Sequence, residues 1–184
     1  MASLGHVAVG LAAARLYRGT KETTGSLVFR CVAFSAASLL PDADVIAFGL
    51  GIPYAAPFGH RGASHSIAFA LACGLVAGLV AARGTTAARG RRVALFIAAI
   101  IATHGPLDAL TDGGEGVALL WPFSTQRIFF PWRPLPVAPI GIHFLSRAGL
   151  AVAKVEILAF APLFLYGLWP RRWMPGASRA SRRD

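Results

Sequence analysis

The amino-acid sequence predicts an all-α protein whose helices form a polytopic membrane bundle, and two observations support that prediction. Hydrophobic residues make up 55% of the 184 positions, charged residues only 14%, and the mean hydropathy is +0.59. The apolar residues also fall into long runs separated by short basic or Gly- and Pro-rich stretches. Such a composition is typical of integral membrane proteins. We expect four to five spans in a single domain, residues 1–170, followed by a basic tail, residues 171–184.

The first two apolar segments differ in length and in regularity. Residues 4–17 would form a helix about 21 Å long, shorter than the hydrocarbon core of roughly 30 Å, so whether this segment spans stays open. Residues 27–50 are long enough to span, but Pro41 disfavours helix at the residue before it. We therefore expect the second helix to break near Asp42 and Asp44. Irregular backbone at membrane depth is tolerated where it is buried in protein or lines a cavity.

Three further apolar segments complete the predicted bundle. Residues 66–82 and 93–110 give the third and fourth spans, joined by a short basic loop at 83–92, and residues 148–169 give the last. The longest non-spanning part, residues 112–147, mixes aromatic residues, arginines and prolines. That mixture is typical of a segment lying at the membrane interface, and we expect it on the outer side.

Basic residues fall mainly on one side of the predicted bundle. When the spans alternate in direction, thirteen of the 18 lysines and arginines share one face, which the positive-inside rule assigns to the cytoplasm. The net charge of +10 is therefore a topology signal, and we expect membrane lipid rather than a specific nucleic acid as partner, with the tail in the cytoplasm on anionic lipid. The thirteen basic residues on the cytoplasmic face are Arg15, Arg18, Lys21, Arg30, Arg83, Arg89, Arg91, Arg92, Arg171, Arg172, Arg179, Arg182 and Arg183.

Histidines and aspartates gather at the opposite face. With the loops placed by charge alone, four of the five histidines and three of the five aspartates fall at one depth. Such side chains are costly in apolar sequence unless they are paired or bound to something, and imidazoles and carboxylates together are ligands of divalent metals. The pattern predicts a metal site rather than scattered buried hydrogen bonds. The candidate ligands are His6, Asp42, Asp44, His60, His65, His104 and Asp108.

The ligand types suggest a metal and a chemistry. Imidazole and carboxylate ligands without a thiolate suit Zn²⁺, with Mn²⁺ or Fe²⁺ as alternatives. A bound metal lowers the pKa of its water toward about 7 and supplies hydroxide. Arg61 can bind a phosphate oxygen through its planar guanidinium; a surface arginine facing lipid headgroups is an equal alternative. Whichever of Asp42 and Asp44 does not bind metal can orient a histidine or act as general base. We assign Asp42 and Arg61 to catalysis.

Four motifs resemble one known family. They are similar to motifs of the YdjM-like inner-membrane family, whose members are regarded as metal-dependent hydrolases. The four motifs are Gly5-His6, LLPDAD at 39–44, HRGASHS at 60–66 and HGPLD at 104–108. The resemblance extends from residue 5 to about residue 140. That family is in turn distantly similar to zinc-dependent phospholipase C and the single-strand-specific zinc nucleases. The resemblance implies a bacterial inner-membrane protein that hydrolyses a phosphoester.

The same resemblance implies a ligand set. In the zinc phosphodiesterases an early His, an Asp, a further His and an HxxxD pair supply two metals, and a later HxxxE pair serves a third. This sequence has His143 followed by Arg147 rather than by Glu, so the resemblance implies one or two metals. The two-metal roles would fall to His6, Asp44 or Asp42, His65 or His60, and His104 with Asp108.

Three functions compete for the same residues. The first is a membrane-embedded hydrolase whose metal-bound hydroxide attacks a lipid or lipid-linked phosphoester at the outer leaflet. The second is a transporter of divalent metal or protons, which would call for access from both faces and often for repeated halves; the sequence shows no repeat. The third is a non-catalytic membrane protein with a closed structural site, for which seven candidate ligands are more than needed. The hydrolase is favoured, and the oligomeric state stays open.

Overall fold

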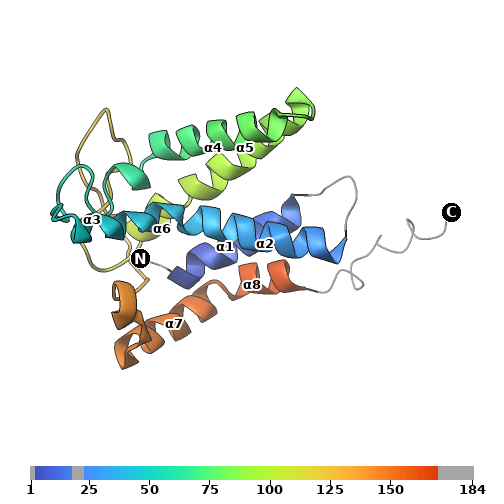
Figure 1. Ribbon diagram of the computed structural model, residues 1–184. Helices are drawn as coiled ribbons and strands as arrows, with labels where there is room; N and C mark the ends of the chain where they lie inside the picture. The colour runs from blue at the N-terminus through green and yellow to red at the C-terminus, as the bar shows by residue number, and fades with distance from the viewer. Residues whose placement is uncertain (1–2, 18–22, 170–184) are drawn as a thin grey trace.

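The computed structural model describes residues 3–17 and 23–169, which fold into a bundle of helices (Figure 1). The predicted tail at 171–184 lies outside this part of the chain, as do Arg18 and Lys21. In chain order the helical elements are α1 (Ser3–Leu16), α2 (Thr24–Leu39), the 3-10 helix η1 (Leu40–Val45), α3 (Ile46–Gly49), the 3-10 helix η2 (Ala63–His65), α4 (Ile67–Ala82), α5 (Ala87–Ala102), α6 (His104–Ala109), the 3-10 helix η3 (Gly141–Leu145), α7 (Arg147–Ala159) and α8 (Ala161–Leu168).

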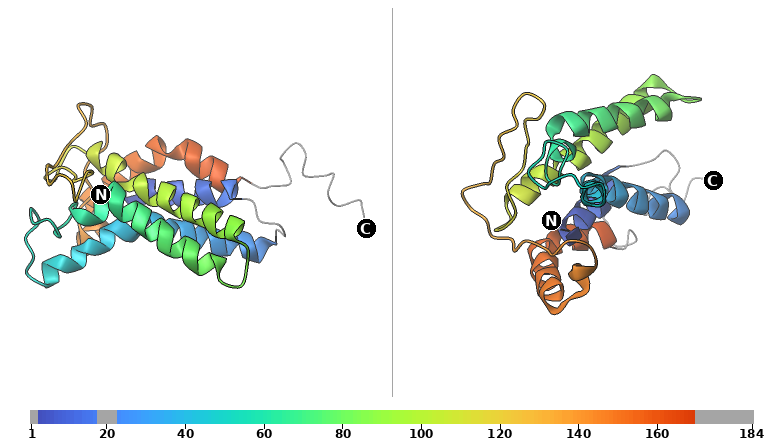
Figure 2. Two further views of the ribbon diagram at one scale, coloured as in Figure 1. Left: turned by 90° about the horizontal axis from the view of Figure 1, so that it is seen from above. Right: turned by 60° about the vertical axis from the view of Figure 1, so that its left-hand side comes forward.

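Small residues bring the helices close together. Helix α1 packs between α2 and α8, and a side chain at Gly10 would run into the backbone of α2 at Ser35. Helices α4 and α5 form a hairpin in which Gly74 and Gly78 face the backbone and alanines of α5. Without a hydrophobic driving force between helices in lipid, such close approach is a main source of packing energy. The hairpin meets α2 near α6 and diverges from it toward the hairpin tip (Figures 1 and 2).

The all-α membrane bundle is confirmed, and residues 3–17 and 23–169 contain fewer full-length spans than the four to five expected. By length and composition, Thr24–Gly49 and Ala87–Ala109 are long and apolar enough to cross a membrane, and the bent pair α7–α8 makes a third if it is one span. The other two predicted spans, α1 and α4, are apolar but only 14 and 16 residues long. At 1.5 Å per residue they reach roughly 21–24 Å, less than the hydrocarbon thickness.

Two helix breaks and one early helix start shape the bundle. Helix α2 changes to 3-10 geometry at Leu40 with Pro41 in its first turn, as expected. The fourth segment starts at Ala87, earlier than expected, because Thr86 caps it and alanines and arginines are good helix formers; the prediction of a basic loop up to residue 92 was wrong for this stretch. The last segment bends by 69° before Pro162, which the sequence analysis did not anticipate.

Loops and short 3-10 turns gather at the α6 end of the bundle. There the segment from α6 to η3 arches past the start of α4 toward α7, as the right-hand view of Figure 2 shows. Its Arg127 guanidinium donates to the carbonyls of Tyr54 (2.8 Å), Ala56 (3.1 Å) and His60 (2.9 Å). The segment from α6 to η3 therefore holds the loop at 50–62, which carries His60, in a fixed position.

Candidate metal centre

Four polar side chains converge where three apolar segments break. Asp42 lies on the 3-10 turn after α2, His65 ends the 3-10 turn before α4, and His104 and Asp108 lie on the short helix after α5. One ligand atom from each lies within 4.8 Å of the others. His104 and Asp108 are fully buried, His65 is 3% exposed and Asp42 is 7% exposed. We call these four residues the metal group, since such a set can hold a divalent cation.

Each histidine of the metal group turns Nε2 toward the carboxylates. The Nδ1 of His104 donates to the carbonyl of Ser38 at 2.6 Å, which leaves Nε2 facing Asp42 Oδ1 at 3.3 Å. The Ser64 hydroxyl donates to Asp44 at 2.5 Å and so accepts from Nδ1 of His65 at 3.0 Å. Hydrogen bonds of this kind on the far nitrogen fix the orientation of metal-binding imidazoles.

Buried atoms without hydrogen bonds mark the centre of the metal group. Within the described residues, both carboxylate oxygens of Asp42 and the Nε2 atoms of His65 and His104 are buried and make none. They lie at ion-pair distance from one another, for example 3.5 Å between His65 Nε2 and Asp42 Oδ1, without the alignment of a hydrogen bond. Native proteins seldom leave such atoms unsatisfied. A cation among them would satisfy all of them at once, so the residues fit a metal.

The charge balance points the same way. Burial alone would lower the pKa of His65, but the nearby carboxylates of Asp108, Asp42 and Asp44 outweigh that effect and raise the pKa to about 10. A neutral imidazole on this loop is therefore surrounded by more negative charge than it can balance. Electrostatically, the site favours an added positive charge, either a proton or a metal ion.

Asp44 lies on the other side of the same imidazole. Its Oδ1 accepts from Nδ1 of His60 at 2.6 Å, and its Oδ2 accepts from Ser64 and from the backbone amide of Arg61 at 3.2 Å. Asp44, His60 and His65 form a second group that could hold a metal ion. Both oxygens of Asp44 are already engaged in hydrogen bonds, whereas those of Asp42 are not.

His6 lies beside the metal group rather than within it. Its ring stacks on that of His104, with centroids 3.6 Å apart and an interplanar angle of 9°. Its Nε2 lies 3.3 Å from Asp108 Oδ1. His6 is fully buried, and Gly5 before it leaves room for the ring of Phe160, which a side chain there would hit.

The Arg61 guanidinium faces the interior. Arg61 is fully buried and has a positive φ of 62°, a conformation that L-residues rarely adopt. Its Nε lies 3.1 Å from Asp108 Oδ2, and its two amino groups donate to the Gly113 carbonyl (2.8 Å) and the Thr111 hydroxyl (3.0 Å). The side chain therefore pairs with a member of the metal group and holds the loop that follows α6.

Three supporting residues were not predicted from the sequence. The backbone carbonyl of Ser38 and the hydroxyl of Ser64 orient the two histidines of the metal group, and the sequence gives no signal for either role. Glu156 of α7 is fully buried, and its Oε2 accepts from the amides of Leu4 (2.6 Å) and Gly5 (3.3 Å) at the start of α1. A lone carboxylate inside an apolar span was the available signal. Glu156 thereby fixes the helix that carries His6.

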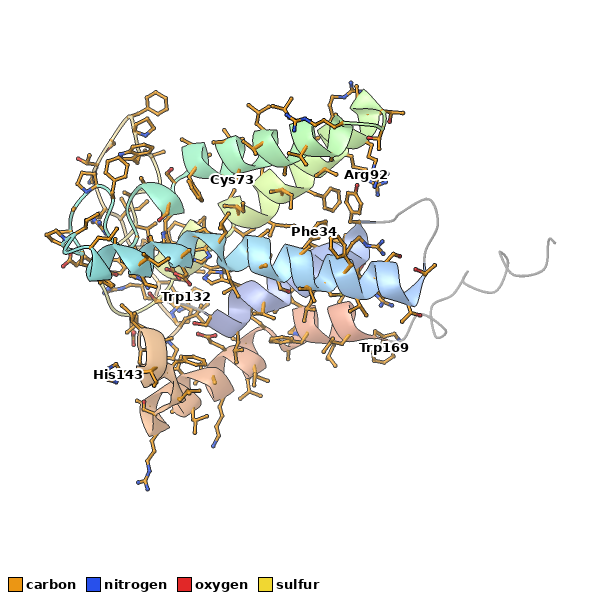
Figure 3. The ribbon with its side chains drawn as sticks, viewed as in Figure 1. Phe34, Cys73, Arg92, Trp132, His143 and Trp169 are labelled. Atoms are coloured by element: carbon orange, nitrogen blue, oxygen red, sulfur yellow. The ribbon has the colours of Figure 1, made fainter. Side chains whose placement is uncertain are left out.

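The remaining histidine stands apart. His143 lies on η3, exposed, at the start of the arm formed by α7 and away from the metal group (Figure 3). All seven residues predicted as candidate ligands, and Arg61, are brought together at one end of the bundle, while His143 is not.

Comparisons with known proteins place the chain in a family. The model of the YdjM inner membrane protein family matches residues 1–174. The inner membrane protein YbcI of Escherichia coli (strain K12) is 38% identical over 158 residues, which cover 84% of this chain and 89% of that protein. No solved structure matches the chain. The protein is therefore a bacterial inner-membrane protein and belongs to the YdjM inner membrane protein family.

Proposed function

We propose that the protein is a membrane-embedded, metal-dependent hydrolase that cleaves a phosphoester of a lipid or lipid-linked substrate. The observation that carries the proposal is the metal group: two imidazoles and two carboxylates converge at a membrane-bundle end, with four of their ligand atoms buried and lacking hydrogen bonds within the described chain. Groups of this kind inside a membrane protein are costly, and they usually mark functional sites.

The metal group would hold one divalent ion, for which Zn²⁺ is the first choice and Mn²⁺ or Fe²⁺ the alternatives. Asp42, His65, His104 and Asp108 would be its ligands. Bound there, the ion would lower the pKa of a water molecule and polarise a phosphoryl oxygen. We assign Asp44 to orienting His60 and His65 rather than to binding, because hydrogen bonds already occupy both of its oxygens. A second ion at Asp44, His60 and His65 would have to replace those bonds.

The chain's own residues would do the remaining work. Ser38 and Ser64 keep the imidazoles in place, and Arg61 balances the charge of Asp108. Asp42 is the most exposed member of the metal group, and its second oxygen is the best-placed base for a proton released by the attacking water. The Arg61 guanidinium would meet a substrate phosphate only if the loop after α6 moved, because its donors bind within the protein.

The outer leaflet is the proposed location of the reaction. Arg83, Arg89 and Arg92 lie at the hairpin tip and the nearby start of α5, while the metal group lies at the opposite end of the bundle. The positive-inside rule puts the hairpin tip in the cytoplasm and therefore the metal group on the periplasmic side. A site at that depth favours a substrate that is itself anchored in the membrane.

Metal content tests the proposal first. The detergent-purified protein, His104→Ala, Asp108→Ala and the control His143→Ala would be measured by elemental analysis. We expect about one zinc or manganese per chain in the wild type and in His143→Ala, and none in the other two. Phosphodiester and phospholipid hydrolysis would then be assayed on the loaded proteins. Absence of stoichiometric metal after reconstitution would overturn the proposal, and so would activity that survives metal loss.

One observation favours a second candidate, a closed structural site. All four members of the metal group are protein residues, and none is more than 7% exposed. Four protein ligands are the usual complement of structural zinc, whereas catalytic zinc keeps an open position. The two candidates differ in the His104→Ala variant: loss of hydrolysis in a folded protein indicates catalysis, whereas loss of folding indicates a structural role.

A further inference from the structure

Residues of α2, α4 and α5 line an apolar groove. The α4–α5 hairpin diverges from α2 toward the hairpin tip (Figure 1). The volume of the groove is about 570 Å³, within the range usual for small-molecule sites. The side chains that form its walls are almost all apolar, and most are small. They include Ala33, Ala36 and Ala37 of α2, Ala72 and Cys73 of α4, and Ile97 of α5. Figure 3 shows Cys73 on the side of α4 that faces α2.

The groove is lined by residues that lie close in sequence to three members of the metal group. Three of its lining residues are Leu40, Phe69 and Ile101. They lie two residues before Asp42, four after His65 and three before His104 in the sequence. Every segment that brings a residue to the metal group therefore also lines the groove, and Leu40 lies on the same 3-10 helix as Asp42, the most exposed member of the group.

The surroundings determine what could fill the groove. Helices α2 and α5 belong to the two helices that are long and apolar enough to cross a membrane, so the groove lies at the depth of lipid acyl chains. Its walls offer a ligand almost no hydrogen bonding, which suits a hydrocarbon chain and disfavours a soluble substrate. Because the metal group is charged, a hydrocarbon ligand that extends from the groove to the metal group would need a polar group at that end.

We propose that the groove holds one acyl chain of a membrane phospholipid, with the phosphoester of that lipid at the Asp42 edge of the metal group. The assignment of this lipid as a substrate rests on the proposed function, but binding of the chain does not. The metal group would select the headgroup phosphate, and the groove would select for length and saturation of the chain. A bulky side chain in the groove should weaken the binding of long-chain lipids without affecting the hydrolysis of small water-soluble phosphoesters.

Photo-labelling tests the binding directly. The full-length, metal-loaded protein would be reconstituted in phosphatidylethanolamine–phosphatidylglycerol vesicles that contain a phospholipid with a diazirine midway along one chain. Labelled peptides are then mapped by mass spectrometry. Ala36→Trp and Ala72→Trp fill the groove from its two walls, and Ala99→Trp is the matched control, because Ala99 is exposed on α5 but does not line the groove. We expect the label on α2 and α4 of the wild-type protein. In Ala36→Trp and Ala72→Trp the tryptophan would displace a few methylenes of the lipid chain, so labelling should fall about tenfold, whereas Ala99→Trp should label like the wild type.

Each outcome decides something. Equal labelling in all three variants, or label confined to other surfaces, overturns the proposal. A shift in oligomer size in Ala36→Trp and Ala72→Trp with unchanged labelling also overturns it, and indicates that a second copy covers the groove through its small residues. Hydrolysis of water-soluble bis(p-nitrophenyl) phosphate reports on the metal group separately. If that activity is absent but the groove is labelled as expected, the proposed function fails and the lipid site stands.

Discussion

The two ends of the bundle are stabilised in different ways. Toward the hairpin end an apolar cluster forms around Phe34, which packs against Ala14 and Ile100, meets the Tyr17 ring edge to face and stacks on the Phe96 ring. At the metal end, buried charges and imidazoles are held by hydrogen bonds and ion pairs between segments that are distant in sequence. Apolar packing tolerates a change by local relaxation, whereas a buried charge that loses its partner keeps its full desolvation cost. The comparison predicts which substitutions affect metal binding and which affect only stability.

Removing one charge at the metal end should have the largest effect. Asp108→Ala leaves Arg61 buried without its carboxylate, which typically costs about 3–5 kcal/mol of stability. The same variant should also lose the metal. Unfolding in mixed detergent micelles measures the first effect and elemental analysis the second. The double variant Asp108→Ala/Arg61→Met should recover part of the stability without recovering the metal. Wild-type stability in the single variant would contradict the role assigned to this pair.

A core substitution at the hairpin end should separate stability from binding. Phe34→Ala removes a buried ring and should cost about 3 kcal/mol. Metal stoichiometry in the folded protein should stay at the wild-type value, because Phe34 contacts no member of the metal group. The same unfolding assay and elemental analysis measure both. Loss of metal from the folded variant would show that the two ends are coupled, against the comparison drawn above.

Glu156 lies between these extremes, since it acts on the metal end through the backbone of α1. Glu156→Ala leaves the amides of Leu4 and Gly5 without their acceptor and should loosen His6. By analogy with residues that orient ligands, metal affinity should fall about 10- to 100-fold. Glu156→Gln retains one acceptor oxygen and should have a smaller effect. Competition with a chelator measures the affinity. Equal affinity in both variants and the wild type would remove Glu156 from the site.

The smallest effect is expected at Ser64, whose hydroxyl links Asp44 to His65. Ser64→Ala should weaken metal binding by about tenfold and change the unfolding free energy by no more than about 1 kcal/mol. Ser124→Ala is the matched control, because its hydroxyl accepts a hydrogen bond from Gln126 in the outer loop, away from the metal group. Chelator competition on both proteins measures the difference. An unchanged affinity in Ser64→Ala would show that His65 needs no such support.

The candidate site was predictable from sequence as a set of residues, but their roles were not. Charge in the loops sufficed to bring His6, His65 and His104 to one face, because topology follows simple electrostatics. The different roles assigned to Asp42 and Asp44 depend on the 3-10 turn, which directs their carboxylates to opposite nitrogens of the His65 imidazole. No periodicity in the sequence reports that geometry.

The fold shows the same limit. Long apolar runs and Pro41 predicted the helices and the first break. The start at Ala87 followed from a cap at Thr86, whose signal was outweighed by the charge of the arginines that follow. The inward direction of Arg61 results from its positive φ, which depends on contacts with the loop after α6. Local patterns could not supply these contacts, since they join residues some 50 positions apart.

The order of the ligands along the chain has a consequence for biogenesis. A nascent chain that has inserted α1, α2 and α4 carries Asp42 and His65, but half of the metal group is still missing until α6 emerges with His104 and Asp108. If the metal group binds an ion as proposed, metallation would have to wait for the α4–α5 hairpin to enter the membrane in the correct orientation. The ion would then join segments that were inserted at different times, so its loading would be the last step of assembly and a check on the topology.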